Sequence, residues 1–154
     1  MLLNWQLKKF DTLTPSELYA IMQLRNEVFV VEQNCLYQDA DDKDQPSWHL
    51  MGTNSEHHLM AYSRLLPAGV AFKEPSIGRV VTSADVRREG AGKELMNEAI
   101  KCCTELFNNA AIRIGAQLYL LQFYRSFGFK QVSEIYLEDG IEHIEMVLNS
   151  KIKE

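Results

Sequence analysis

The stretch SIGRVVTSADVRREGAGKELMNEAIKCCTEL, residues 76–106, contains a predicted strand, a glycine-containing loop and a predicted helix in direct succession. The apolar run at residues 77–82 predicts a short β-strand. From residue 93 to residue 107 apolar side chains recur at spacings of three and four, which predicts an amphipathic helix. The hexad RREGAG, residues 87–92, therefore lies at the N-terminus of that helix.

This hexad has the features of an anion-binding loop. Glycines let backbone amides approach a ligand closely, and the unpaired amides at the start of a helix favour phosphate. Arg87, Arg88 and Lys93 add positive charge at the same place. The Gly-Lys-Ser/Thr ending of the P-loop and the Gly-x-Gly-x-x-Gly fingerprint are both missing. Taken alone, the hexad fits an ordinary glycine-rich turn equally well.

The composition is that of a globular chain without a basic excess. Of the 154 residues, 46% are hydrophobic and 24% are charged, and the formal net charge is -5. We predict one domain, residues 1–154, whose core needs neither metal nor disulfide. The acidic balance argues against nucleic acid as a partner, because nucleic-acid-binding domains usually carry a basic stripe. It weakly favours a cationic substrate.

The cysteines and the N-terminus predict a cytoplasmic protein. Three cysteines are an odd number, and Cys102 and Cys103 are adjacent in a helical pattern, which argues against a secretory disulfide framework. We interpret all three as structural. Residues 1–10 lack the apolar run of a signal peptide. No stretch approaches the ~20 apolar residues that cross a bilayer, so no membrane partner is expected.

A first helix is marked by its start signals. Thr14, Pro15 and Glu17 supply an N-cap, a proline at the first helical position and the partner that closes a capping box. Apolar residues follow at helical spacing: Leu18, Ile21, Met22, Val28 and Phe29. Arg25 falls on the same face, where it needs an acidic partner or a water-filled cleft. Alternatively, its stem packs while its head reaches solvent.

Residues 33–46 form a predicted acidic loop. It contains Asp39, Asp41, Asp42 and Asp44, but a calcium loop starting at Asp39 would require a glycine at position 44 and a glutamate at position 50. The plain alternative is a solvated loop. The adjacent residues 57 and 58, both histidine, lack partners at metal-ligand spacing, so no metal site is predicted.

The remaining pattern predicts mostly strands. A short strand is expected around Trp5 and Leu7, and the turn Asp139-Gly140 is a strong hairpin signal. A helix is expected to end at Gly128. The other predicted elements are strands at residues 48–53, 59–66, 112–116, 130–138 and 141–148, and a helix at residues 118–127.

Two motifs resemble those of a known family. The run Arg-x-x-Gly-x-Gly at residues 87–92 is similar to the CoA pyrophosphate signature of the GNAT acyltransferase superfamily. Tyr-x-x-x-Gly-Phe at residues 124–129, after a predicted strand, is similar to its second signature. The resemblance covers nearly the whole chain for the ElaA-like subfamily. It extends through Leu24-Arg25-x-x-Val28-Phe29-Val30-Val31-Glu32-Gln33-Asn34-Cys35, Tyr37-Gln38-Asp39, Gly115-Ala116-Gln117 and Glu138-Asp139-Gly140-Ile141.

The resemblance implies a fold and a cosubstrate. The fold is α+β, with a mixed, mostly antiparallel sheet flanked by helices on both faces and splayed between the strands ending near Thr82 and Ala116. The mixed order of strands and helices agrees with it. The cosubstrate is acetyl-CoA, with no metal. The residues implied in its binding are Val80, Thr82, Arg87, Arg88, Glu89, Gly90, Ala91, Gly92 and Lys93.

The resemblance also implies roles within this set. Backbone groups of Val80 and Thr82 pair with pantetheine, so the departure of Thr82 from the usual aliphatic residue should matter little. Tyr124 is the implied proton donor to the CoA thiolate. Because a thiol titrates near ~8.5 and a tyrosine near ~10, complete transfer is uphill by only about 1.5 pH units. The alternative is that Tyr124 only packs as an aromatic.

The acceptor side is less well specified. An attacking amine must lose a proton, and Glu32 and His49 are the candidate bases, each with a plain alternative as a surface acid or a strand histidine. A set of charged residues is expected to form an ion-paired wall of the acceptor cleft. These are Arg25, Arg64 and Arg79 with Asp39 and Asp41.

We therefore predict direct transfer of acetyl from acetyl-CoA to a primary amine, in a ternary complex and without a cysteine acyl-enzyme. Two alternatives stay open. Residues in the first half, Arg25, Phe29, Asp39, Asp41 and Arg64, also resemble acyl-homoserine lactone synthases, which lack the Arg-x-x-Gly-x-Gly loop. A module that binds CoA without turnover is the other. The acceptor, and whether the protein is a monomer or homodimer, stay open.

Overall fold

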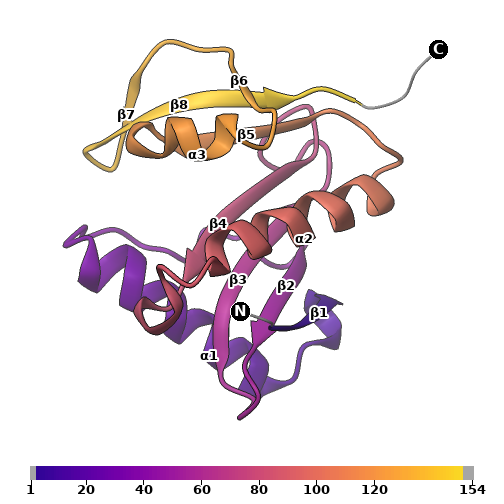
Figure 1. Ribbon diagram of the computed structural model, residues 1–154, viewed down its shortest axis with the longest axis vertical. Coiled ribbons are helices and arrows are strands. Elements are labelled where there is room, and N and C mark those ends of the chain that lie inside the picture. The colour runs from indigo at the N-terminus through magenta and orange to yellow at the C-terminus, as the bar shows by residue number, and fades with distance from the viewer. Residues whose placement is uncertain (1–2, 151–154) are drawn as a thin grey trace.

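Two separate antiparallel sheets form the framework of the molecule in the computed structural model, which describes residues 3–150. Residues 1–2 and 151–154, the ends of the predicted domain, lie outside the described residues. The first sheet has the strand order β1-β2-β3-β4 (Figure 1). Its strands are β1 (Asn4–Lys9), β2 (Trp48–Thr53), β3 (Leu59–Leu66) and β4 (Ser76–Thr82). The bounds predicted for β2 and β3 are confirmed.

The second sheet is built around β8 (Ile141–Leu148), which pairs with β5, β6 and β7. The partners are β5 (Ile112–Gln117), β6 (Lys130–Gln131) and β7 (Tyr136–Glu138). The prediction of one strand over residues 130–138 was therefore wrong. Ser133 interrupts the pairing because its hydroxyl, in place of a backbone carbonyl, accepts the Glu145 amide at 2.8 Å.

The two sheets meet at one end and separate at the other. The Arg113 amide donates to the Pro75 carbonyl at 3.0 Å, at the start of β5 and just before β4. Beyond this point β4 and β5 share no ladder of paired residues within the described chain. They diverge toward Thr82 and Gln117, where the sequence predicts the splay. The predicted α+β fold is confirmed.

Helices cover both faces of the first sheet because alternate strand residues point to opposite sides. Leu50 and Leu65 pack with the main core under α2 (Ala91–Leu106), together with Leu95 and Met96. Their neighbours in the strands face α1 (Pro15–Arg25) instead. This second cluster consists of Ile21, Leu24, Val28, Met51, Tyr62 and Val81. No helix among residues 3–150 is long and apolar enough to cross a membrane.

The first helix begins with the predicted capping box. The Glu17 amide donates to Thr14 Oγ1 at 3.1 Å, and the Thr14 amide donates to Glu17 Oε1 at 2.8 Å. After Arg25 the helix widens into the π-helix η2 (Asn26–Glu32), which was not predicted. Its buried residue is Val28, so the wider turn keeps the apolar stripe on the sheet while bringing Glu32 toward β4.

The predicted helix at residues 118–127 is shorter than expected. A 3-10 turn η4 (Leu118–Leu120) precedes α3 (Leu121–Arg125), which lies against the second sheet (Figure 1). The chain leaves the helix at Gly128, whose φ of +100° is a left-handed conformation that favours glycine. Two further 3-10 turns are η1 (Phe10–Thr12) and η3 (Ala84–Val86).

Candidate functional site

A cavity of about 480 Å³ lies where β4 and β5 diverge. Its walls come from β4, η2, the end of β5, α3 and the β7–β8 hairpin. Seven of the predicted site residues line it: Glu32, Arg79, Val80, Thr82, Arg87, Gly92 and Tyr124. The structure thus brings the two sequence signatures, which lie about thirty residues apart, to one cavity.

The loop before α2 has the conformation of an anion site. Arg88 has φ +70° and Gly90 has φ +81°, so the chain folds back tightly onto the helix start. No side chain caps α2, and its first intrahelical bond runs from the Glu94 amide to the Gly90 carbonyl at 3.0 Å. The amides of the first three helical residues, Ala91 to Lys93, therefore have no intrahelical acceptor. They favour an anion there.

Gly92 forms the point where this loop meets the cavity. A Cβ added at Gly92 would lie 3.8 Å from Phe123 Cζ, an ordinary contact distance. A methyl group therefore fits, whereas a long acidic side chain would extend over the helix N-terminus. The other loop residues, Arg88, Glu89, Gly90, Ala91 and Lys93, adjoin the cavity mouth without lining it.

Arg87 is paired with Glu32, and both line the cavity. Its guanidinium donates to both carboxylate oxygens of Glu32, one of them at 3.0 Å, and to the Thr82 carbonyl at 3.1 Å. The hydrogen bond from Arg87 lowers the pKa of the Glu32 carboxyl, and the same bond raises the pKa of Arg87. A carboxylate paired in this way is a poor proton acceptor, which weakens Glu32 as a candidate base.

β4 is distorted where it passes the cavity. Arg79 has φ +48°, and the pairing of β3 with β4 shifts register between Tyr62 and Arg64. A non-glycine residue in this conformation costs about 1–3 kcal/mol, which the surroundings must offset. Arg79 Nε lies 2.9 Å from Asp39 Oδ1 and its NH2 lies 3.2 Å from Asp41 Oδ2, so two ion pairs hold the distortion.

Arg79 belongs to a buried ion cluster, defined here as Arg25, Arg64 and Arg79 with Asp39, Asp41 and Asp44. Arg25 is completely buried and contacts Asp39 and Asp44, each at 2.7 Å. Arg64 contacts Asp41 at 2.7 Å and Asp44 at 2.9 Å. The three positive and three negative formal charges cancel. The acidic partner predicted for Arg25 is therefore present.

The ion cluster corrects the interpretation of residues 33–46 as a solvated loop. Asp39 is 4% exposed and Asp44 is 7% exposed, so the loop is fastened to the sheet. Burial alone would raise the pKa of Asp44, but hydrogen bonds from Arg25 and Arg64 hold it below its ordinary value. Within this cluster only Arg79 lines the cavity. The expected ion pairs are present, but Arg25, Arg64, Asp39 and Asp41 do not line the cavity.

His49 lies in the core and not in the cavity. Its side chain is fully buried, and burial lowers its pKa. Nε2 lies 2.9 Å from the Asp44 carbonyl, which can only accept, so Nε2 carries the proton. Nδ1 then accepts from the Tyr62 hydroxyl at 2.7 Å. Both ring nitrogens are occupied, so His49 is not placed to act as a base on a bound amine.

The ring of Tyr124 is buried, but its hydroxyl is free to donate a hydrogen bond. It is 6% exposed and packs edge-to-face on Phe123 at 5.2 Å and Phe129 at 6.0 Å. Burial raises its pKa, which keeps the phenol protonated. Its hydroxyl has no hydrogen-bond partner within residues 3–150. The ring therefore packs, as the plain alternative holds, while the hydroxyl stays free to donate.

Several cavity residues were not identified from the sequence. Gln33 and Gln117 exchange side-chain hydrogen bonds at 3.4 and 3.5 Å, linking η2 to the end of β5. His143 of β8 lies opposite Gln117 in the strand pairing and also lines the cavity. The pairing of β5 with β8 could have identified His143, because residues directly opposite in adjacent antiparallel strands share a face.

The cysteines do not form a nucleophilic centre. Burial raises the pKa of Cys103 to about 12, and it also raises the pKa of Cys102. Cys35 lines the cavity, and its thiol lies 3.3 Å from the Asp139 carbonyl, which joins the acidic loop to the β7–β8 hairpin. Residues 3–150 contain no group of three or more potential ligands that could hold a metal ion.

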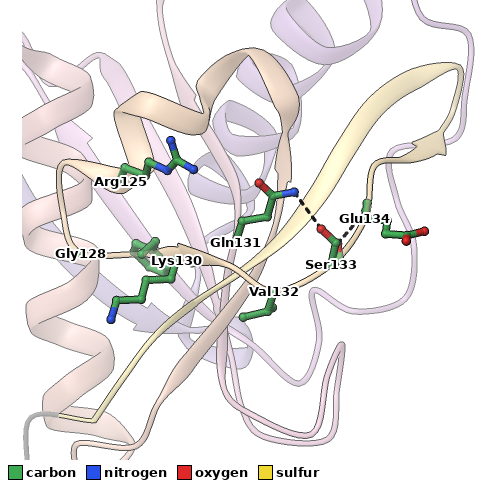
Figure 2. Close-up of a pocket in the computed structure, with 8 residues that line it drawn as sticks. Arg125, Gly128, Lys130, Gln131, Val132, Ser133 and Glu134 are labelled. Carbon is green, nitrogen blue, oxygen red and sulfur yellow. Dashed lines mark hydrogen bonds between the residues drawn. The ribbon is translucent and has the colours of Figure 1, made fainter.

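A second hollow of about 890 Å³ lies on the outer side of the second sheet. Figure 2 shows Arg125 and Lys130 extending from its edge, and Gln131 donating to the Ser133 carbonyl at 2.9 Å. All its residues come from the segment 125–134, and most of them are exposed. It contains none of the predicted site residues.

Comparison with known proteins points to one family. A model described as an acetyltransferase (GNAT) domain matches residues 17–150. The ElaA protein of Escherichia coli is 42% identical over 147 residues, which cover 94% of this chain and 95% of that protein. Its crystal structure has a TM-score of 0.88 to this chain at 41% identity, and the match covers 95% of this chain and 99% of that one.

Two further solved structures are similar. An acyl-CoA N-acyltransferase from Pseudomonas aeruginosa has a TM-score of 0.90 at 42% identity, and the match covers 95% of this chain and 99% of that one. A CoA-dependent acyl-homoserine lactone synthase, solved with isopentyl-CoA, has a TM-score of 0.77 at 14% identity, covering 96% of this chain and 84% of that one. At this identity the likeness shows a common fold alone.

Proposed function

Because the chain belongs to the GNAT acetyltransferase family, we propose that it transfers an acetyl group from acetyl-CoA to a primary amine by direct attack in a ternary complex. Family and fold support acyl transfer from an acyl-CoA and confirm the resemblance found in the sequence. The observation that carries the finer proposal is the joint lining of one cavity by Gly92 of the anion loop and by Tyr124.

In this proposal the CoA pyrophosphate binds at the start of α2. The uncapped amides of Ala91, Gly92 and Lys93 provide donors, and the side chains of Arg88 and Lys93 add positive charge. Pantetheine then follows β4, whose edge toward β5 is unpaired beyond Pro75. The Thr82 carbonyl is already occupied by Arg87, so Val80 offers the freer backbone contact.

Tyr124 acts on the leaving group. When the amine attacks the thioester carbonyl carbon, the C–S bond breaks and negative charge develops on sulfur. A buried phenol without a competing partner places an O–H donor at that charge, which stabilises the transition state even without complete proton transfer. The raised pKa of Tyr124 favours donation of a hydrogen bond over loss of the proton.

The charges around the cavity favour a cationic acceptor. Arg79 and Arg87 both line it, but each is neutralised by a carboxylate partner. Glu138 and Asp139 of the β7–β8 hairpin line the opposite side, and neither has an arginine or lysine partner among residues 3–150. The uncompensated charge is therefore negative, which suits an alkylammonium group.

A mass-spectrometric screen of polyamines, amino acids and peptide N-termini with acetyl-CoA tests the proposal. We expect at least one amine to be acetylated by the wild-type protein. Gly92→Glu should weaken CoA binding by about 100-fold, or about 2.8 kcal/mol, in calorimetry. Gly92→Ala is the matched control and should bind within about threefold, since its Cβ meets only ordinary contacts.

The outcomes separate the alternatives. Absence of CoA binding would overturn the whole proposal. CoA binding without acetylation of any amine would favour a module that binds CoA without turnover. Thiol release measured separately with acetyl-CoA and with a hexanoyl carrier protein distinguishes an acetyltransferase from an acyl-homoserine lactone synthase. An amine acetylated equally by wild type and Gly92→Glu does not count as a substrate.

A further inference from the structure

His143 is the one histidine among residues 3–150 that lines the cavity. It lies on β8, is 7% exposed and stacks on Tyr136 of β7, with ring centroids 5.9 Å apart. Its neighbour Ile144 points into the core, so His143 itself faces the cavity together with Gln117. The fold therefore fixes both the position and the plane of this imidazole.

The hydrogen bonds of His143 determine which nitrogen carries the proton. Nδ1 lies 2.8 Å from the Ile141 carbonyl, and because a carbonyl can only accept, Nδ1 must be the donor. In the neutral ring the lone pair is therefore on Nε2. His49 has the opposite arrangement, in which Nε2 donates and the lone pair on Nδ1 is used by the Tyr62 hydroxyl.

The Nε2 lone pair of His143 faces another acceptor. Glu138 Oε2 lies 3.4 Å away, and an ionised carboxylate has no proton to donate. A proton bound between His143 Nε2 and Glu138 Oε2 would satisfy both acceptors. The Glu138 carboxylate is 59% exposed, so it stays in contact with solvent while it supports the imidazolium that a proton would create.

We propose that His143 Nε2 is the general base that deprotonates the acceptor ammonium, and that Glu138 is a positioning residue for the protonated ring. This inference rests on the proposed function and names the base for which Glu32 and His49 were the sequence candidates. Glu32 is paired with Arg87, and His49 is enclosed in the core. His143 has the required lone pair in the cavity.

The step balances as follows. Nε2 takes one proton from R–NH3⁺, and the freed lone pair forms the new C–N bond with the acetyl carbonyl carbon. The C–S bond breaks, and its electron pair leaves on sulfur. Tyr124 donates a hydrogen bond to the developing thiolate, and the second proton that the nitrogen loses protonates the sulfur. The proton on His143 passes to solvent, so one proton is released for each amide formed.

Other titratable groups share this part of the cavity. Tyr136 and Glu138 on β7 contact His143 directly. The other titratable or charged groups near it in the cavity lining are Asp139, Cys35, Tyr37 and Arg79. Arg79 is neutralised by its aspartate partners. Negative groups thus predominate on the side of His143, which favours both an incoming ammonium and the imidazolium formed from it.

Kinetics of His143→Gln test the proposal, with the amine that the wild type acetylates best in the screen as probe. We expect kcat to fall by about 100-fold or more, the contribution typical of a general base. The acid-side limb of the kcat pH profile should disappear, while CoA binding in calorimetry stays unchanged. Glu138→Gln should lower kcat by about tenfold and shift the same limb.

The matched control is His58→Gln. His58 also lies beside a glutamate, with Nδ1 3.9 Å from Glu56 Oε2, but it is exposed at a hairpin tip away from the cavity. Its kcat and pH profile should equal those of the wild type. If His143→Gln also retains the wild-type kcat and acid limb, the base assignment is overturned while the proposed function stands. If the wild type acetylates no amine, both fail.

A second measurement is independent of the acceptor. Nitrogen-15 correlation spectra of the full chain at pH 8 report which ring nitrogen carries hydrogen, and His143→Gln identifies the signal. We expect the tautomer protonated at Nδ1 for His143 and at Nε2 for His49. Protonation of His143 at Nε2 would remove the lone pair from the cavity and overturn the proposal.

Discussion

The cavity has two sides that are built in different ways. The side formed by β4 and the start of α2 presents backbone groups, placed by a strand edge, a glycine turn and a helix N-terminus. The side formed by residues 33–46 and the β7–β8 hairpin presents side chains, which are held by other side chains. Most substitutions leave the backbone donors and acceptors in place. A network of side-chain contacts, in contrast, is disrupted when any one of its residues is replaced.

The ion cluster shows how strong this dependence is. Its members are far apart in sequence, and the loop that carries the aspartates is held to the sheet by their pairing with arginines of α1, β3 and β4. Removing charges from water is costly, and the attraction offsets that cost only when every partner is present. The acceptor side should therefore be the more fragile of the two.

Asp44→Asn should produce the largest effect. Asp44 contacts both Arg25 and Arg64, so the substitution leaves two buried guanidinium groups without full compensation. We expect the free energy of unfolding to fall by about 3–5 kcal/mol, as measured by urea denaturation.

Asp42→Asn is the matched control, because Asp42 lies in the same loop and is exposed. Its φ of +63° also suits asparagine, so stability should change by no more than about 0.5 kcal/mol. Equal losses in the two variants would mean that the net charge of the loop, and not the ion cluster, governs stability.

Tyr124→Phe separates CoA binding from the chemical step. The ring contacts with Phe123 and Phe129 are retained, so folding and CoA affinity should stay unchanged. Loss of the hydroxyl should lower kcat by about 100-fold, or about 2.8 kcal/mol. Tyr19→Phe, at an exposed tyrosine outside the cavity, is the control. An unchanged kcat in Tyr124→Phe would reduce this residue to a packing role.

The same contrast explains what the sequence predicted. The anion loop and Tyr124 belong to short continuous motifs whose conformations depend on neighbours along the chain, and Arg87, Gly92 and Tyr124 line the cavity. Strands β2 and β3 had the predicted bounds because alternation and turn residues are local signals. Fold and family were therefore predictable from the residues themselves.

Side chains positioned by long-range contacts were not predictable. Whether a histidine faces a core or a cavity depends on strand register and on the element that covers each face. His49 lies under η1, with its ring near Phe10, whereas His143 faces the divergence of the sheets. Asp44 is one of four aspartates in the loop, and only the tertiary structure shows which of them are buried.

The pH dependence of stability tests the placement of His49. Burial lowers its pKa in the folded state, so below the unfolded value of about 6.5 the unfolded chain binds more protons. Stability from this group is complete above pH 6.5 and is lost as pH falls toward the lowered folded pKa. The slope below pH 6.5 should be at most about 1.4 kcal/mol per pH unit.

Urea denaturation at several pH values measures this slope. His49→Gln should remove the contribution, whereas His58→Gln, at an exposed site, should retain it. If His49→Gln keeps the wild-type slope, His49 is not the neutral, buried histidine described above. The main reason for excluding His49 as the general base, its burial in the core, would then no longer hold.

Thr82→Val should have the smallest effect of these substitutions. An unchanged CoA affinity would support a contact made by the backbone of β4 and not by the Thr82 side chain. Thr82 lines the cavity on β4, but its hydrogen bond to Arg87 uses the backbone carbonyl, which valine also provides. Valine has nearly the same shape and a high strand propensity, so the β4 edge should be unchanged. CoA affinity in calorimetry should therefore stay within about twofold, or about 0.4 kcal/mol. A tenfold loss would show that the threonine hydroxyl contacts the ligand, and that this side of the cavity also depends on side chains.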